Sequence, residues 1–182
     1  EDKLKTMSQN NDFLLSIIIP VLNEQNNIKP LLNRLLPIIK DYKYEVIFID
    51  DGSTDNTNSE IKKYTSKNSN IKLISFYRNF GHQMALSCGY SKASGDCIIS
   101  MDSDLQDPPE IIQQIINKWK SGSLVVYAKR KTRSVDNLFK RVSASFFYNL
   151  MNFLSDVPIP KDVGDFRLLD RKVVDYLNSL PE

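Results

Sequence analysis

Apolar runs and amphipathic segments alternate along the chain from residue 14 to residue 128. The apolar runs are rich in isoleucine and valine and stop at polar residues or proline, a pattern typical of buried strands. They predict strands at residues 14–21, 45–49, 71–76, 96–101 and 124–128. The segments between them predict helices, at residues 28–39, 56–66, 81–92 and 108–120.

Strict alternation of strand and helix predicts an α/β fold with a mostly parallel sheet and helices on both faces. At 182 residues, the chain has room for one domain with a substantial core. We expect that domain to span residues 13–182, with a polar tail at residues 1–12. The sequence shows no internal repeat and no low-complexity linker.

Composition narrows the function only a little. A net charge of +2 gives no general argument for nucleic-acid binding. Two cysteines, Cys88 and Cys97, have neither metal-ligand spacing nor a disulfide pattern, which favours a reducing compartment. The single histidine, His82, argues against most zinc sites and histidine-based triads, and we assign it no catalytic role. We find no apolar run long enough to cross a bilayer and no signal peptide.

The strongest chemical signal follows the fourth predicted strand, where Asp102 and Asp104 precede Asp107 and two prolines. Residues two positions apart in an extended segment can face the same side. Two carboxylates with open coordination positions suit Mg²⁺ or Mn²⁺ held jointly with a substrate's phosphates. A solvated acidic turn that caps the next helix is the alternative.

Two more polar loops follow predicted strands, at residues 21–24 and 50–55. Loops at the carboxyl ends of parallel strands converge on one crevice, where such folds bind ligands. Neither a G-x-G-x-x-G nor a G-x-x-x-x-G-K-[ST] motif follows the first strand, so a dinucleotide-binding fold and a P-loop enzyme are disfavoured. A crevice lined by acids instead indicates a nucleoside diphosphate bound through a divalent ion.

Five motifs in order resemble the family 2 glycosyltransferases of the GT-A fold, from residue 15 to the end of the chain. They are IIPVLNE at 18–24, IDDGSTD at 49–55, RNFG at 78–81, DSDLQDPPE at 102–110 and GDFRL at 164–168. The third and fifth resemble the polyprenyl-phosphate branch, which includes bactoprenol glucosyltransferases and dolichyl-phosphate mannose synthases.

The resemblance implies a role for each matching position. Metal ligands would be Asp102, Asp104 and, as a further candidate, Gln106. Donor binding would involve Pro20, Leu22, Glu24, Asp51, Arg78, Asp102, Ser103, Arg130 and Arg133. Asp51 would accept a hydrogen bond from the base, and the arginines would neutralise phosphates. For Arg130 and Arg133, a solvated basic loop is the alternative.

Asp104, Asp165 and Arg167 are the catalytic candidates. In relatives that glycosylate a hydroxyl, an aspartate in the region that corresponds to Asp165 acts as a general base on the acceptor. A polyprenyl phosphate is already largely ionised at pH 7, since the second pKa of such a phosphate is about 6. Asp165 would then orient Arg167 or the acceptor, or simply form an ion pair with Arg167.

Residues 138–154 predict a basic, aromatic, amphipathic helix. Such a helix can lie in a membrane interface, pack on the core or form a subunit contact. The sequence is compatible with a homo-oligomer but does not determine the oligomeric state. We expect the domain to work at the cytoplasmic face of a membrane, either by surface docking or with a C-terminal membrane part that is missing from this chain.

The resulting hypothesis is a metal-dependent, inverting glycosyltransferase that moves a hexose, with glucose favoured, from a UDP-sugar to polyprenyl phosphate. One alternative is a family 2 enzyme that uses a saccharide or other hydroxyl acceptor. Another is a nucleotide-sugar-binding module without turnover. The sequence does not identify the sugar, and it favours UDP over GDP only through the bacterial character of the resemblance.

Overall fold

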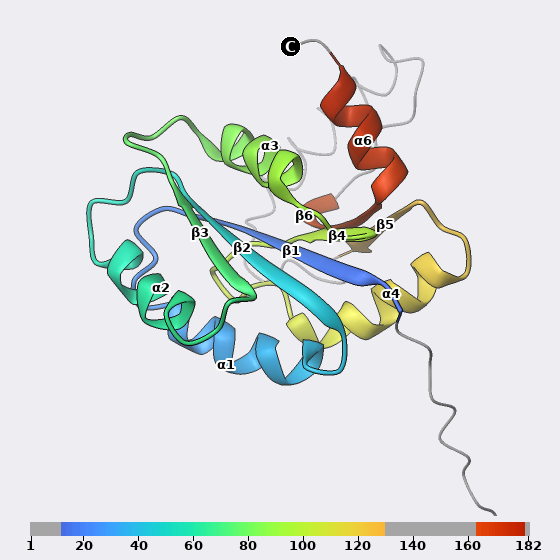
Figure 1. The fold of residues 1–182 in the computed structure, drawn as a ribbon, viewed down its shortest axis with the longest axis horizontal. Helices are drawn as coiled ribbons and strands as arrows, with labels where there is room; N and C mark the ends of the chain where they lie inside the picture. The colour runs from blue at the N-terminus through green and yellow to red at the C-terminus, as the bar shows by residue number, and fades with distance from the viewer. Residues whose placement is uncertain (1–11, 130–162, 181–182) are drawn as a thin grey trace, which may run out of the picture.

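The computed structural model describes residues 12–129 and 163–180 of the chain. These residues form a six-stranded sheet in the order β3-β2-β1-β4-β6-β5 (Figure 1). Strands β1 to β4 are mutually parallel, and β6 runs antiparallel to both β4 and β5. The strands are β1 (Leu14–Val21), β2 (Lys43–Asp50), β3 (Ile71–Ser75), β4 (Cys97–Ser100), β5 (Val125–Lys129) and β6 (Val163–Asp170).

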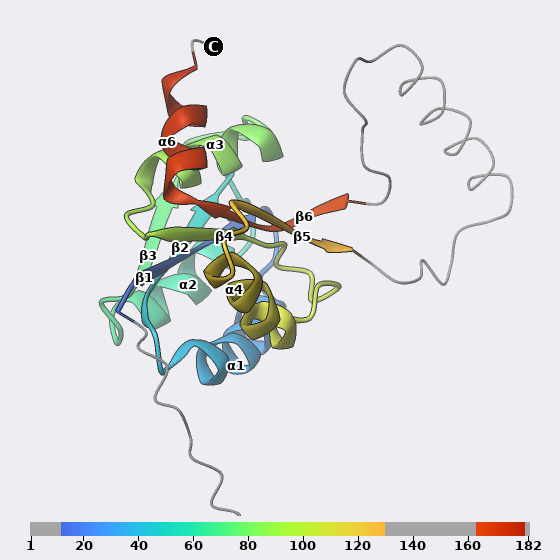
Figure 2. The ribbon, with the colours of Figure 1, turned by 90° about the vertical axis from the view of Figure 1, so that its right-hand side faces the viewer.

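Helices cover both faces of the sheet, as the sequence predicts. Helices α1 (Ile28–Ile39), α2 (Thr57–Thr65) and α4 (Ile112–Lys120) lie on one face, and α3 (His82–Lys92) and α6 (Arg171–Ser179) lie on the other (Figures 1 and 2). Alternate residues of the central strands therefore enter two separate cores. In β1, Ile17 and Ile19 pack toward α1, whereas Ile18 packs toward α3.

All five predicted strands are present, as are the helices predicted at residues 28–39, 56–66, 81–92 and 108–120, with small shifts at their ends. The predicted helix at residues 108–120 starts differently, because Pro108 is extended and a 3₁₀ turn, η1 (Pro109–Ile111), precedes α4. Strand β6 and helix α6 were not predicted. Strand β6 lies between β4 and β5, so β5 does not pair with any of the parallel strands.

Specific hydrogen bonds attach the C-terminal elements to the rest of the fold. Asp170 caps α6 by accepting from the backbone of Lys172, and its other oxygen accepts from the indole of Trp119 on α4 at 2.7 Å. Arg171 donates to the carbonyls of Ala93 and Gly95 at 2.8 and 2.6 Å, in the connection between α3 and β4. These contacts hold β6 in register at the end of the parallel sheet.

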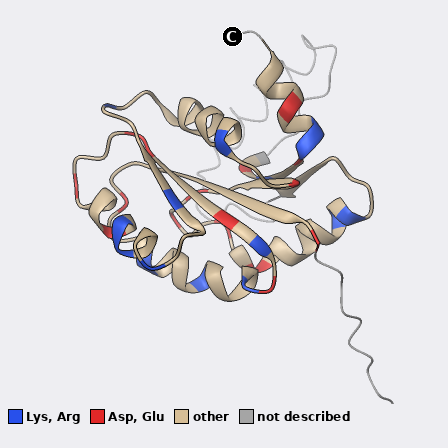
Figure 3. Ribbon diagram, viewed as in Figure 1, with Lys and Arg blue, Asp and Glu red and all other residues tan. Residues whose placement is uncertain are grey.

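Basic and acidic residues are interspersed over the helices and strands drawn in Figure 3. This distribution agrees with the near-neutral net charge of +2. Among the residues that the structure describes, none of the helices has the length and apolar character needed to cross a bilayer. The candidates Arg130 and Arg133, the amphipathic segment at 138–154 and the predicted tail up to residue 11 lie outside the described residues.

Candidate functional site

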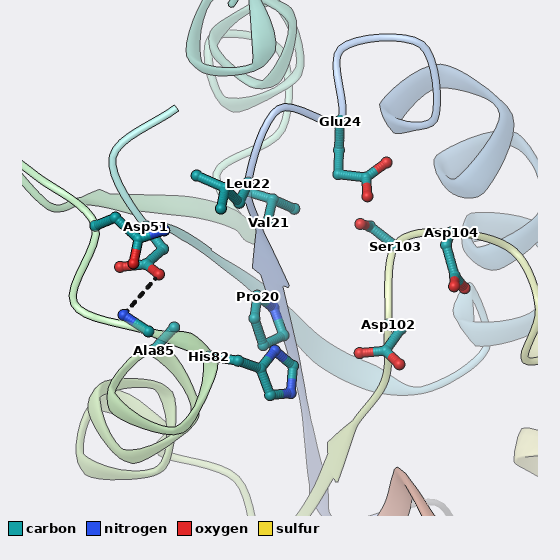
Figure 4. Close-up of a pocket in the computed structure, with 12 residues that line it drawn as sticks. Pro20, Val21, Leu22, Glu24, Asp51, His82, Ala85, Asp102, Ser103 and Asp104 are labelled. Carbon is teal, nitrogen blue, oxygen red and sulfur yellow. Dashed lines mark hydrogen bonds between the residues drawn. The ribbon is translucent and has the colours of Figure 1, made fainter. Parts of the chain in front are cut away.

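A cavity of about 260 Å³ opens at the edge of the sheet where the parallel strands end (Figure 4). Its walls come from the loops after β1, β2, β3 and β4 and from the start of α3. The lining residues are Pro20, Val21, Leu22, Glu24, Asp51, Asn79, Gly81, His82, Ala85, Asp102, Ser103 and Asp104. The predicted convergence of three polar loops on one crevice is therefore confirmed.

The loops after β1 and β2 are held to each other by side-chain hydrogen bonds. Asn23, in a left-handed conformation with φ of 57°, accepts from the backbone of Thr54 at 2.9 Å and donates its own backbone N–H to Ser53. The backbone of Glu24 donates to Thr57 at 2.7 Å. These bonds fix the loop that carries Leu22 and Glu24 to the cavity.

Asp51 anchors the loop that follows β3. It is 4% exposed, and its two carboxylate oxygens accept from the backbone N–H groups of Phe80 and Gly81 at 2.7 and 2.9 Å. Gly52 allows the two loops to approach, because its φ is 77° and a side chain there would lie 2.5 Å from the backbone of Arg78. Each carboxylate oxygen of Asp51 keeps acceptor capacity, since it has two lone pairs.

Asp102 and Asp104 follow β4 and both line the cavity. The Asp104 carboxylate accepts from the backbone of Gln106 at 3.0 Å, and Leu105 between them has a φ of 63°. Burial raises the pKa of Asp102; His82 opposes this rise, while Asp104 and Asp165 add to it by repulsion. A positive charge is therefore favourable beside Asp102.

Strand β6 brings Asp165 and Arg167 to this edge from the end of the chain. Ser100 on β4 pairs with Arg167, so Asp165, two residues earlier on an antiparallel strand, lies beyond the end of β4 on the side of Asp102. The Ser100 hydroxyl donates to the Asp165 carbonyl at 2.6 Å, and Tyr90 donates to Ser100 at 3.0 Å. Asp165 is thus positioned by its hydrogen bond with Ser100, and Arg167 by its pairing with Ser100 in the sheet.

The Asp165 carboxylate lies between the guanidinium of Arg167 and the imidazole of His82. One guanidinium nitrogen of Arg167 is 3.8 Å from one oxygen, and Nε2 of His82 is 3.0 Å from the other. Arg167 also donates from Nε to the Tyr90 hydroxyl at 3.2 Å. The ion pair with Arg167 that the sequence left open is present, although it is long.

His82 is the residue that the sequence reasoning missed. It begins α3, directly after Gly81, whose φ of 99° favours glycine. Its ring and the Asp102 carboxylate point toward each other in the cavity (Figure 4). The available signal was its position next to the RNFG motif at the amino end of a helix, at the edge of the sheet where ligands bind.

Comparison with known proteins identifies the family. Residues 16–177 match the family described as Glycosyl transferase family 2. The chain belongs to this family. It is 43% identical over 170 residues to a bactoprenol glucosyl transferase of Shigella phage SfV, a match that covers 92% of this chain and 55% of the relative. The chain spans about half the length of the curated relatives it matches.

Solved structures of other glycosyltransferases share the fold. Glucosyl-3-phosphoglycerate synthase from Mycobacterium tuberculosis, in complex with Mn²⁺, UDP and phosphoglyceric acid, matches with a TM-score of 0.64 at 22% identity, over 89% of this chain and 57% of that one. The mannosyltransferase PcManGT from Pyrobaculum calidifontis, in complex with GDP-Man and Mn²⁺, matches with a TM-score of 0.63 at 20% identity, over 93% and 48%. The predicted GT-A fold is confirmed.

Most of the candidates predicted for this family 2 chain lie together. Of the described candidates, Pro20, Leu22, Glu24, Asp51, Asp102, Ser103 and Asp104 line the cavity. Four do not. Gln106 is exposed outside the lining, and the Arg78 guanidinium lies over the ring of Phe80, 4.2 Å from its centroid, on the surface. Asp165 and Arg167 are not lining residues either, although Asp165 contacts His82, which is one.

The side chains at the cavity suit a divalent cation as ligand groups. Asp102 and Asp104 present carboxylates to the cavity, and a further group of His82, Asp102 and Asp165 has candidate ligand atoms within 4.8 Å of one another. Hard carboxylate oxygens with room for ligand phosphates are typical of Mg²⁺ and Mn²⁺ sites. The residues present therefore suit the predicted metal.

Proposed function

We propose that this chain is the catalytic domain of a metal-dependent, inverting glycosyltransferase that transfers glucose from UDP-glucose to a polyprenyl phosphate. The observation that carries the proposal is the acid-lined cavity formed by the matching family motifs, with Asp102 and Asp104 at one wall. The relative named as a bactoprenol glucosyl transferase supports the acceptor and the sugar. The structural neighbours bound to UDP or GDP-Man with Mn²⁺ support a nucleotide donor and a metal.

The donor would lie along the loops after β1, β2 and β4. Leu22 and Glu24 would contact the base and ribose, with Asp51 as a hydrogen-bond acceptor for a base N–H. Asp102 and Asp104 would hold the cation, which neutralises the diphosphate and stabilises it as a leaving group. Ser103 is 4% exposed at the cavity wall, and its hydroxyl can serve the ribose or the sugar.

The reaction is a single displacement. An oxygen of the acceptor phosphate attacks the anomeric carbon, the new carbon–oxygen bond forms, and the bond to the β-phosphate breaks with its electron pair leaving on UDP. The acceptor loses one negative charge and UDP gains one, so an ionised phosphate needs no general base. Arg167, held by Tyr90 and paired with Asp165, would bind the acceptor phosphate beside the leaving diphosphate.

The binding half of the proposal is tested by thermal unfolding with UDP, GDP or CDP, each with Mn²⁺ or with EDTA. A ligand at about 100 times its Kd adds about 2.7 kcal/mol to the free energy of unfolding, which raises Tm by about 5 to 10 °C for a chain of this size. We expect this rise with UDP and Mn²⁺, and its loss with EDTA or in Asp104→Asn. Asp175→Asn, which removes an exposed carboxylate of α6, should behave like the native chain.

The acceptor is tested by supplying UDP-glucose and Mn²⁺ with either a polyprenyl phosphate or the matching polyprenol in detergent. Transfer to the phosphate alone supports the proposal. Transfer to the polyprenol or to a saccharide would identify the hydroxyl-acceptor alternative. Normal UDP binding without transfer to any acceptor would indicate a binding module and contradict the enzyme hypothesis.

A further inference from the structure

Three potential metal ligands from separate parts of the chain meet beside the cavity, and two of them, His82 and Asp102, line it. They are Nε2 of His82 at the start of α3, a carboxylate oxygen of Asp102 after β4, and a carboxylate oxygen of Asp165 near the start of β6. All of these candidate ligand atoms lie within 4.8 Å of one another. The group combines one imidazole with two carboxylates, so it is more than a cluster of acids.

The backbone at each of the three positions is held by contacts outside the group. The residue before His82, Gly81, donates to buried Asp51 at 2.9 Å. Asp102 comes two residues after Ser100, which is fully buried in β4. The Asp165 carbonyl accepts from that same Ser100 hydroxyl. The three side chains are therefore presented by ordered elements, which is what a preformed ligand set requires.

The three ligand atoms could bind one ion if they moved slightly closer to one another. First-row metals bind imidazole nitrogen and carboxylate oxygen at about 2.0 to 2.2 Å, so two donors on one ion lie about 3 to 4.4 Å apart. The separation of 3.0 Å between His82 and Asp165 is already in this range. A cation would also relieve the repulsion between the two carboxylates.

We propose that His82 is a ligand of the divalent cation, through Nε2, together with one carboxylate oxygen each of Asp102 and Asp165. The proposal rests on the metal dependence of the proposed function and names a ligand that the family motifs did not suggest. Imidazole binds first-row transition metals better than it binds Mg²⁺. The site should therefore prefer Mn²⁺ to Mg²⁺, and His82 should be the reason.

This set of metal ligands shares Asp102 with the set predicted from the motifs. It has His82 and Asp165 in place of Asp104 and Gln106. Gln106 is exposed, and its backbone donates to Asp104. Asp104 still faces the cavity and can contribute on the opposite side of Asp102 from His82 (Figure 4). The two sets make different predictions, because only the set with His82 places a nitrogen on the metal.

The test uses Mn²⁺ alone, added to the chain without donor or acceptor. Binding is measured by the loss of the sharp aqueous Mn²⁺ signal in electron paramagnetic resonance. Pulsed measurements on the bound ion then report whether a directly bonded nitrogen is present. We expect nitrogen coupling in the native chain and its loss in His82→Asn. We also expect a tenfold or larger increase in the Kd for Mn²⁺, since even residues behind the ligands contribute about 10- to 100-fold.

Gln83→Ala is the matched control, because Gln83 is the next residue of α3, is exposed and does not line the cavity. It should keep both the affinity and the nitrogen coupling. In His82→Asn, the Kd for Mg²⁺ should rise less than that for Mn²⁺, so the preference for Mn²⁺ should shrink.

Bound Mn²⁺ without nitrogen coupling in the native chain would overturn the proposal, and this result needs no variant to fold. Slower transfer in His82→Asn with unchanged Mn²⁺ affinity would also overturn it and would make His82 a positioning residue for Asp165. Nitrogen coupling in a chain that transfers no sugar would keep the metal site and reject the proposed function instead.

Discussion

Two aspartates of the cavity show how the surroundings of a residue decide what it can do. Asp51 is buried, and both of its oxygens accept backbone N–H groups, so its side chain organises a loop. Asp102 is partly buried and lies beside other carboxylates, and the pKa of its side chain is raised. Asp51 therefore has a structural role, whereas a bound cation would stabilise the ionised form of Asp102.

A third buried carboxylate, Glu45, lies in the half of β2 remote from the cavity. It accepts from the Lys72 ammonium at 2.6 Å, from the Ser94 backbone at 2.7 Å and from the Ser16 hydroxyl. Burial by itself would raise the pKa of Glu45, but these hydrogen bonds together hold it below its usual value of 4.5. The ionised form is therefore the one that stabilises the fold.

Glu45→Gln should lower the free energy of unfolding at neutral pH by about 1 to 3 kcal/mol, because hydrogen bonds to a charged group are lost or weakened. A carboxyl with a lowered pKa in the folded state contributes its stability above its unfolded value of 4.5, and this contribution is lost as the pH falls through the folded value. The difference between the native chain and the variant should thus shrink below that pH.

Urea unfolding from about pH 6 to about pH 3 measures this difference, a range chosen to bracket the ordinary carboxyl pKa. Glu60→Gln is the control, since Glu60 pairs with Lys63 on the surface of α2 and should show little effect at any pH. A constant difference between the native chain and Glu45→Gln across the range would contradict the assignment.

At the scale of elements, the close approach of α3 to the sheet is needed to bring His82 to the cavity. Gly89 lies in the middle of α3, and a Cβ atom there would be 2.3 Å from Cγ2 of Ile18 on β1. Ile18 is fully buried and β-branched, so its χ1 cannot turn away easily. The absence of a side chain at Gly89 therefore sets the distance between α3 and β1.

Gly89→Ala should destabilise the chain by about 1 to 3 kcal/mol, the usual cost of overpacking a core. The sign is the informative part, because Gly→Ala inside an unconstrained helix stabilises by about 0.5 to 1 kcal/mol. Ser91→Ala, on the exposed side of the same helix, is the matched control and should be close to neutral. Thermal unfolding of both variants provides the measurement, and a higher Tm for Gly89→Ala would show that α3 does not press on β1.

For the whole molecule, the position of β6 unites two parts of the chain that are far apart in sequence. Phe166, Leu168 and Leu169 of β6 are almost fully buried, as is Val174 of α6. Burying one such side chain contributes about 1.5 to 3 kcal/mol. The four together are comparable to the total stability of a typical domain, about 5 to 15 kcal/mol. The C-terminal elements are thus part of the folding unit.

A chain truncated after residue 129 should consequently fail to fold cooperatively. It would lose the strand that joins β4 to β5, together with Asp165 and Arg167. A chain of residues 1–180 keeps β6 and α6 and serves as the control. Urea unfolding followed by circular dichroism compares the two, and equal stability and cooperativity in the shorter chain would refute the assignment.

The sequence alone was sufficient for the parallel part of the fold and for most of the cavity. Apolar runs ended by polar loops located β1 to β5, because a buried strand must be apolar and its exit must be polar. The parallel arrangement then placed the loops with Leu22, Asp51 and Asp102 at one edge, where the structure has them. These features follow from local pattern and from the handedness of strand–helix–strand connections.

Only the tertiary structure decided where β6 inserts and which side chains surround Asp102. Residues 163–170 carry a recognisable motif, but β6 pairs with β4 on one side and with β5 on the other. These strands are separated from β6 by dozens of residues in the sequence, and no local pattern specifies the register of the pairing. The same holds for His82, because an isolated histidine in a sequence is usually interpreted as structural. Its role as a candidate ligand arises because the turn at Gly81 and the antiparallel entry of β6 bring its ring within 3.0 Å of Asp165.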